Sequence, residues 1–286
     1  MSIKKSICTS VKYFPVFLLL FLLVYSGCQK TRPVGLPATY QEKFDQPYGP
    51  DSLRQYDLFL PQGRNQSTKM IIVIHGGGWV SGEKEFIDYY ARRFSDFGYA
   101  AVSMNYRLAN DSVHYQDMLN DIDSMIGCTS RNSGQWGIGN GKVALFGYSA
   151  GGHLALLYSY SRDKGRNVGS VISLAGPTDI QDNLLWESPG LYEEIGFMAG
   201  NTLAVTWTQA NPVHFISATN PATLLIHGTN DSIVPVSQSL KLKELLEATN
   251  VKVNILLLEN ETHSYSSQAT KRLLEETRRF LDANMK

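Results

Sequence analysis

Short segments made almost entirely of apolar residues alternate along this chain with longer amphipathic segments. Apolar runs rich in Val, Ile and Leu are typical of strands buried on both faces, as in parallel sheets. The predicted strands cover residues 54–60, 69–74, 99–105, 142–146, 168–174, 222–227 and 251–258. The predicted helices cover residues 85–97, 114–130, 150–161, 236–248 and 266–283. This alternation indicates an α/β fold, a mostly parallel sheet with helices on both faces and the first strand at an edge.

The length and composition of the chain limit the number of domains and the class of protein further. At 286 residues it suits one such domain and is too short for two comfortable ones. With 43% hydrophobic and 18% charged residues, its composition is ordinary for a globular protein. The formal net charge is zero and there is no basic block, so nothing favours a nucleic-acid partner.

The N-terminal segment predicts export. Three lysines accompany an apolar run over residues 14–25, which has the length of a signal-peptide core and is short for a bilayer span. Small residues then lead to Cys28, and the pattern resembles a bacterial lipoprotein signal, although Tyr25 stands where that signal usually has Leu, Val or Ile. We therefore expect a signal peptide over residues 1–27 and a lipid on Cys28 that tethers the protein to a bacterial cell-envelope membrane. Ordinary cleavage near Gly27 and an uncleaved anchor are the alternatives.

Two further segments stand apart from the alternating pattern. Residues 28–49 are rich in proline and polar residues and are predicted to be a tether to the folded domain over residues 50–286. Residues 178–215 contain no clean strand, yet they carry many large apolar side chains. A plain loop is seldom that long or that apolar. We expect this segment to form a small lid or a wall of a pocket.

A serine lies between two glycines where a predicted strand gives way to a predicted helix, in the segment Gly147-Tyr148-Ser149-Ala150-Gly151. A sharp strand-to-helix turn crowds the backbone two residues to either side, and glycine relieves that crowding. The turn then presents the serine hydroxyl at the top of the sheet. The pattern predicts that Ser149 is a nucleophile. The alternative is a glycine-rich turn with an incidental serine.

Three consecutive glycines follow another buried strand, in His75-Gly76-Gly77-Gly78-Trp79. Consecutive glycines let a loop turn its N–H groups into a cleft, where acyl transfer needs donors for a developing oxyanion. We expect these donors at Gly77 and Gly78, together with the N–H of Ala150 at a helix N-terminus. His75 is expected to brace the loop. A phosphate-binding loop is disfavoured, because no lysine follows in the required position.

A general base has to come from one of six histidines. His263 follows the strand over residues 251–258 by a short polar loop and precedes the last predicted helix, so it is placed to reach over the nucleophile. His227 ends a strand and His153 lies in the first turn after Ser149, so both are expected to be packed. His114 and His214 have no context that favours a function.

The acid that orients the base is predicted to be Asp231. It follows the strand over residues 222–227, and the order Ser, Asp, His along the chain is the one found with this kind of nucleophile turn. Asp179, after the preceding strand, is the competitor. Glu259 and Glu261 are weaker candidates.

The motifs GYSAGGH, HGGGW and HGTNDSIVP together resemble those of α/β-hydrolase esterases related to hormone-sensitive lipase and to acetyl-esterase-like carbohydrate esterases. The resemblance covers roughly residues 50–285. It implies an α/β-hydrolase catalytic domain that cleaves esters through an acyl-enzyme, with no metal or cofactor. Many hormone-sensitive-lipase relatives have Asp where this chain has Tyr148. Trp79 and the compact lid instead resemble carbohydrate esterases and arylformamidases.

The resemblance and the motifs together predict a serine carboxylesterase for short-chain acyl esters that deacetylates carbohydrates. Trp79, Tyr148 and Trp186 are expected to contact a small-molecule or oligosaccharide substrate. Membrane contact is expected through the N-terminal lipid alone, and the oligomeric state is left open. The alternatives are an amide or formamide hydrolase, a peptidase with the same three residues, or a non-catalytic binding protein of the same fold.

Overall fold

The computed structural model describes residues 38–285 of the chain. The predicted signal peptide, the predicted lipid on Cys28 and the first part of the predicted tether lie outside the described residues. Within the described part, no helix is both long and apolar enough to cross a membrane.

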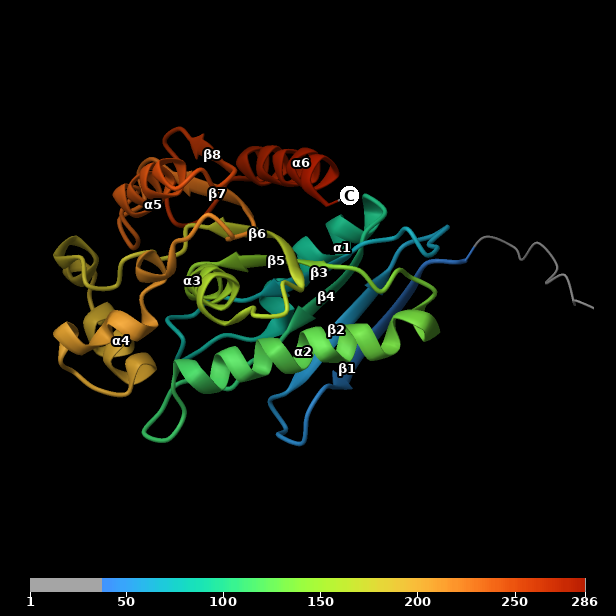
Figure 1. Ribbon diagram of the computed structural model, residues 1–286, viewed down its shortest axis with the longest axis horizontal. Helices are drawn as coiled ribbons and strands as arrows, with labels where there is room; N and C mark the ends of the chain where they lie inside the picture. Colours follow the sequence, from blue (N-terminus) through green and yellow to red (C-terminus); the bar gives the residue numbers. More distant parts are fainter. Residues whose placement is uncertain (1–37, 286) are drawn as a thin grey trace, which may run out of the picture. The chain divides into compact units, whose positions relative to one another are not determined.

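The described residues form one eight-stranded sheet (Figure 1). Its strands lie in the spatial order β1-β2-β4-β3-β5-β6-β7-β8. The pairs β1/β2 and β2/β4 are antiparallel, and all the other pairs are parallel. The strands are β1 Gln41–Pro47, β2 Gln55–Leu60, β3 Met70–Ile74, β4 Ala100–Met104, β5 Val143–Tyr148, β6 Val168–Leu174, β7 Ala222–Gly228 and β8 Val253–Leu258. The mostly parallel sheet expected from the apolar runs is confirmed.

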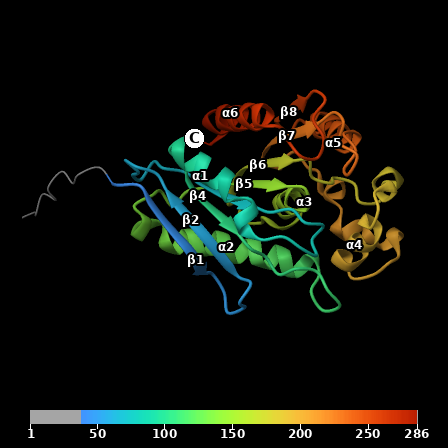
Figure 2. The same ribbon diagram turned by 180° about the vertical axis from the view of Figure 1, so that it is seen from behind.

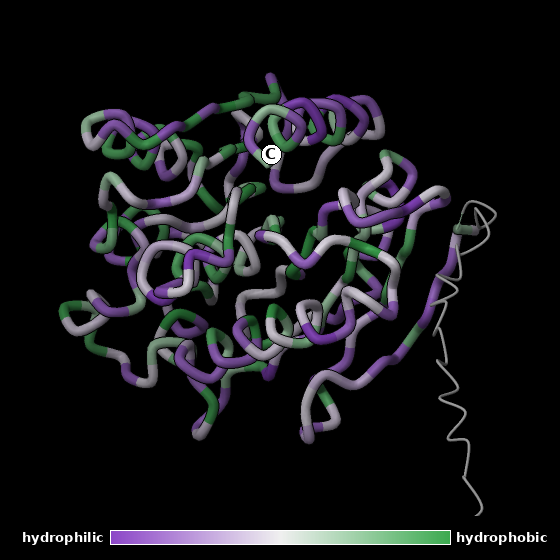
Figure 3. The backbone as a smooth tube through the Cα atoms, turned by 45° about the vertical axis from the view of Figure 1, so that its right-hand side comes forward, coloured by the Kyte–Doolittle hydropathy of each residue, from purple (hydrophilic) through white to green (hydrophobic). Residues whose placement is uncertain are grey.

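Helices cover both faces of this sheet (Figures 1 and 2). The α-helices are α1 Asp88–Asp96, α2 Tyr115–Trp136, α3 Ala150–Leu157, α4 Leu191–Ala199, α5 Ser237–Ala248 and α6 Ser267–Asn284. One core cluster joins one face of the sheet to α1 and α6, through residues such as Phe94 and Leu273. The other joins the opposite face to α2, α3 and α5, through residues such as Ile122, Leu154 and Leu242. Figure 3 shows hydrophobic stretches of the chain in the interior, and hydrophobic and hydrophilic stretches side by side on the outer segments.

The predicted tether is corrected at its C-terminal end. Gln41–Pro47 is strand β1, which pairs with β2 and forms one edge of the sheet. Most of its side chains are exposed, so it shows no apolar alternation, and its place in the sheet comes from backbone hydrogen bonds to β2. Phe44 adds an edge-to-face contact with Phe59. The polar sequence of this strand therefore gave no pattern from which a strand could be predicted.

Three helices also differ from their predicted bounds. Helix α1, predicted over residues 85–97, covers Asp88–Asp96 and follows a separate 3-10 turn at Lys84–Phe86. Helix α2 continues to Trp136, beyond the predicted residue 130, because Ser133 and Trp136 still face the core. It ends at Gly137, whose φ of 71° is the left-handed conformation that glycine adopts at helix ends. Helix α3 is α-helical only to Leu157 and continues as a π-helical turn over Tyr158–Arg162.

The segment over residues 178–215, all of which the structure describes, consists of short helices and contains no strand. Besides α4 it has 3-10 helices at Asn183–Glu187, Ala204–Ala210 and Pro212–Phe215. Trp186, Tyr192 and Trp207 pack against one another with ring centroids 5.3 to 6.0 Å apart. The segment lies at the carboxyl-terminal end of β5, on the side toward which the arrow of that strand points (Figure 1).

Candidate active site

Ser149 occupies a strained turn between β5 and α3. Its φ of 54° and ψ of −122° lie outside the regions that a non-glycine residue favours. The turn is held because the Ser149 N–H donates to the Leu174 carbonyl at 2.8 Å. A Cβ at Gly147 would collide with the backbone of Gly151, and one at Gly151 would collide with the carbonyl groups that end β3. The flanking glycines are therefore needed for the reason that the sequence indicated.

His263 and Asp231 complete a hydrogen-bonded series with this serine. His263 Nε2 lies 3.0 Å from Ser149 Oγ, and His263 Nδ1 lies 2.7 Å from Asp231 Oδ2. A carboxylate only accepts hydrogen bonds, so Nδ1 carries the proton and Nε2 is left to accept from the serine hydroxyl. Such a series is able to take a proton from Ser149 when the hydroxyl attacks.

The carboxylate of Asp231 is held in an ionised state. Its side chain is fully buried, which raises its pKa, but hydrogen bonds with His227 and His263 outweigh that effect and hold the pKa well below its usual value. The N–H groups of Ile233 and Val234 both donate to Oδ1 at 2.9 Å. Four groups therefore fix this carboxylate, and His227 belongs to its support.

The glycine loop after β3 lies directly beside the serine. A Cβ at Gly76 would be 3.0 Å from Ser149 Cβ. Gly77 and Gly78 have φ values of 113° and 58°, and the Gly77 carbonyl accepts from the Ser81 N–H at 2.9 Å, so the loop turns tightly. Ala150 is the first residue of α3. The predicted donors thus lie on two segments next to the serine. Gly77 and Gly78 are in the glycine loop, and Ala150 directly follows Ser149 in its turn.

The expected substrate contact at Trp79 is corrected. Its side chain is completely buried, and its indole N–H donates to His153 Nδ1 at 3.1 Å. The indole also packs edge-on against the His153 ring, so it supports the loop from inside and has no surface for a substrate. The sequence suggested the contact because Trp79 directly follows the glycines, and one of these, Gly76, does lie beside Ser149.

Tyr148 and Trp186 are both half-buried. The Tyr148 hydroxyl donates to the main-chain carbonyl of His263 at 2.7 Å. The Trp186 indole N–H donates to the Ile180 carbonyl at 2.9 Å, and its ring lies in the aromatic cluster of the segment over residues 178–215. Both hydrogen-bonding groups are thus engaged within the protein, and only the rings are left to meet a substrate.

The remaining candidates have structural partners. His75 is buried and stacks on Tyr106 with ring centroids 4.3 Å apart, and His153 is buried against Trp79. Asp179 binds Lys241 at 2.6 Å and Asn211 at 2.8 Å, so it is engaged away from His263. Among residues 38–285 no group of three His, Cys, Asp or Glu side chains is arranged to hold a metal ion.

Two contacts of the site were not expected from the sequence. One is the bond from Tyr148 to His263, which joins residues 115 positions apart. The other is the approach of Glu194, from α4, to Gly78 of the glycine loop. Neither has a local signal, since both depend on how distant segments pack.

Known proteins with a similar sequence or fold include esterases. The sequence pattern of the BD-FAE family matches residues 56–246, which is most of the folded domain. The chain belongs to the BD-FAE family. Among curated proteins it is similar to the "Probable isoprenylcysteine alpha-carbonyl methylesterase ICME" of Oryza sativa subsp. japonica, at 25% identity over 236 residues. That match covers 76% of this chain and 56% of the relative, and the chain spans about half the length of the curated relatives it matches.

Solved structures show the same fold. Esterase B of Lactobacillus rhamnosis is similar with a TM-score of 0.71 and 25% identity, over 87% of either chain. A truncated carbohydrate esterase from gut microbiota has a TM-score of 0.72 at 19% identity, over 85% of this chain and 98% of that one. These relatives and neighbours are carboxylic ester hydrolases. The α/β-hydrolase fold and the esterase kinship expected from the motifs are therefore confirmed.

Proposed function

We propose that this chain is a serine carboxylesterase that hydrolyses short-chain acyl esters. The observation that carries the proposal is the hydrogen-bonded series from Ser149 through His263 to Asp231, set beside a loop of three glycines. A serine in a strained turn, a histidine with its acceptor nitrogen toward that serine and a buried carboxylate behind it are the parts that acyl transfer requires.

The proposed reaction begins when Ser149 Oγ attacks the ester carbonyl carbon and His263 Nε2 takes the hydroxyl proton. Asp231 stabilises the imidazolium that forms and keeps Nδ1 protonated. The oxyanion is stabilised by N–H groups of Gly77, Gly78 and Ala150. His263 then gives its proton to the leaving alkoxide. Water, activated by the same histidine, attacks the acyl-enzyme and frees the acid.

The proposed substrate is an ester with a small acyl group, and the alcohol part is a carbohydrate. The segment over residues 178–215 is short and built from small helices around an aromatic cluster. Aromatic faces near a few polar groups suit a sugar or aryl alcohol. A similar fold occurs in a protein named as a carbohydrate esterase, which supports this choice by analogy.

A substrate panel tests the proposal. It contains aryl esters from acetyl to dodecanoyl, acetylated xylo-oligosaccharides, an aryl formamide and a peptide anilide. We expect kcat/KM to be highest from acetyl to butyryl and to fall at least about tenfold by octanoyl, because a short pocket has to expose each further methylene. Faster cleavage of the formamide or anilide would favour an amidase instead. Peak activity on dodecanoyl esters would favour a lipase, and no cleavage of any member would favour a binding protein.

The cellular location is a second part of the proposal. Cys28 follows an apolar run and small residues, so we propose that it carries the lipid of an exported, membrane-tethered protein. Stable anchoring needs more than one acyl chain, because a single chain gives only marginal binding. Cys28→Ala should release the protein from the membrane fraction or stall its processing. Recovery of the unchanged protein as a fully soluble species with an unmodified N-terminus near residue 28 would contradict this.

A further inference from the structure

The carboxylate of Glu194 lies against the glycine loop. Glu194 is in the first turn of α4, and a Cβ placed on Gly78 would overlap its carboxylate. Gly78 also has a φ of 58°, so any side chain there would be strained as well as crowded. The third glycine of the loop thus has two roles. It allows the turn, and it leaves the room in which an acidic side chain from α4 reaches the loop.

This carboxylate has no protein partner within the part of the chain that the structure describes. Glu194 is half-buried, and its pKa is raised by burial and by the neighbouring Glu193, with no hydrogen bond to lower it. A partly desolvated carboxylate without a donor is costly, and a ligand that supplies a donor regains that free energy.

Glu194 opens onto a hollow between α4 and the loop that follows β4. The hollow has a volume of about 440 Å³, and its lining includes Val80, Asp111, Glu193 and Phe197. With Ala109 and Glu194, which also line it, the hollow combines three apolar side chains with three carboxylates. Glu194, which lines the hollow, also lies against Gly78, so the hollow borders the glycine loop of the proposed reaction site.

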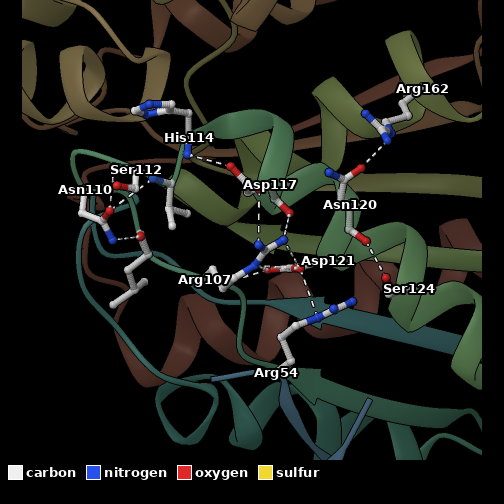
Figure 4. A network of polar contacts seen from close by, with 12 residues as sticks. Arg54, Arg107, Asn110, Ser112, His114, Asp117, Asn120, Asp121, Ser124 and Arg162 are labelled. Atoms are coloured by element: carbon white, nitrogen blue, oxygen red, sulfur yellow. Dashed lines mark hydrogen bonds and ion pairs between the residues drawn. The ribbon is translucent and has the colours of Figure 1, made fainter. Parts of the chain in front are cut away.

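The loop after β4, which forms one wall of this hollow, is fixed to α2 (Figure 4), and α4, which forms the other wall, contacts the residue before α2. Arg107 donates to Asp121 at 2.8 Å, and Asn110 Oδ1 accepts from the Ser112 N–H at 2.9 Å, which shapes the loop. His114 at the start of α2 lies with Nδ1 3.0 Å from the Phe197 carbonyl of α4. A wall held in this way presents Glu194 in one place, as a specificity contact requires.

We infer that Glu194 is a specificity residue that accepts a hydrogen bond from a hydroxyl group of the substrate, so that esters of polyhydroxylated alcohols are preferred over esters of plain alcohols. The inference rests on the proposed esterase function. The hydroxyl donates to the carboxylate, while the C–H face of the same alcohol packs on Phe197 and Val80. Glu193 and Asp111 offer further acceptors along the hollow, which suits an alcohol with several hydroxyl groups.

Two esters of similar size and the same acyl group test the inference: glyceryl monoacetate, with two free hydroxyls, and propyl acetate, with none. We expect the unmodified protein to prefer glyceryl monoacetate. Glu194→Gln should lower kcat/KM for it by roughly tenfold, since a hydrogen bond to a neutral amide is about half as strong as one to a carboxylate. The same variant should leave propyl acetate within about twofold, and Glu194→Ala should extend the loss on glyceryl monoacetate.

Glu187→Gln is the matched control, because Glu187 is exposed in the same segment and should leave both esters unchanged. An equal loss on the two esters with Glu194→Gln would overturn the inference, since it would mean that Glu194 only supports the glycine loop. An unchanged preference would overturn it too. Acetylcholine serves as a third ester. If Glu194→Gln lowers kcat/KM for acetylcholine alone, Glu194 recognises a cationic group and not a hydroxyl, and the inference is overturned. Failure of the unmodified protein to cleave either acetate would contradict the proposed function itself.

Discussion

Tyr148 holds the main chain of His263. Its hydroxyl donates to the His263 carbonyl at 2.7 Å, and its ring stacks on the imidazole with ring centroids 5.3 Å apart. Burial, together with Tyr90 and Asp231, raises the pKa of Tyr148 to about 12, so the hydroxyl stays protonated and able to donate near neutral pH. The residue before Ser149 thus fixes the backbone of the histidine that faces Ser149.

Tyr148→Phe tests whether this contact positions the histidine. The variant keeps the ring and loses the donor, so we expect kcat to fall by up to about tenfold while KM changes little. The matched control is Tyr265→Phe. Tyr265 packs against the Tyr148 ring, and its hydroxyl makes no hydrogen bond within residues 38–285. A rise in KM with unchanged kcat would instead assign Tyr148 to substrate binding.

Ser149→Ala removes the proposed nucleophile and very little volume. We expect kcat to fall by roughly 10⁴-fold or more, with the unfolding midpoint close to that of the unmodified protein. A fluorophosphonate probe should label the unmodified protein at Ser149 and leave the variant unlabelled. Labelling of the variant at another residue would contradict the assignment.

Asp231→Asn and Asp179→Asn separate the two candidate acids. An amide at residue 231 presents an N–H₂ group as well as an oxygen, so it no longer enforces the tautomer in which His263 Nδ1 is protonated, and we expect kcat to fall on the order of 10³-fold or more. Asp179 bonds Lys241 and Asn211, so its replacement should affect stability more than turnover. Steady-state kinetics on an aryl acetate would show the order, and the reverse order would place the acid after β6.

Much of this site is predictable because its residues follow buried strands. The strands β5 and β7 are apolar runs, and Ser149 and Asp231 come soon after them, while His263 follows β8 by a short loop. The carboxyl ends of parallel strands meet at one edge of a sheet, so recognising the strands already brings the three residues together. The glycines beside Ser149 add a steric signal that is also local.

The parts that could not be predicted depend on contacts between distant segments. Trp79 is buried because His153, 74 residues further along, offers an acceptor to its indole. Strand β1 is polar, so its place at the sheet edge comes from backbone pairing and leaves no apolar pattern. The approach of Glu194 to Gly78 depends on where the segment over residues 178–215 packs, and nothing in the sequence around Glu194 indicates it.

The last prediction concerns His153, which must be neutral in the folded protein. Its Nδ1 accepts from the Trp79 indole at 3.1 Å, and its Nε2 lies 2.8 Å from the Ala210 carbonyl, to which it donates. A protonated ring would lose the acceptor that Trp79 requires. Burial lowers the pKa of His153 to about 4, compared with 6.5 for the free side chain. Between these values the unfolded chain binds a proton that the folded protein does not.

The free energy of unfolding should therefore fall as the pH drops from 6.5 toward 4, and this contribution should be fully present above pH 6.5. The His153 contribution has an upper limit of about 1.4 kcal/mol for each unit of pKa difference. Chemical unfolding between pH 5 and 7 measures the slope, and His153→Gln, which cannot titrate, should have a shallower one. His75 is the internal comparison, because burial lowers its pKa to about 4 as well, so part of the slope should persist in the variant. Identical slopes for the variant and the unmodified protein would show that His153 accepts a proton as readily in the folded protein as in the unfolded chain.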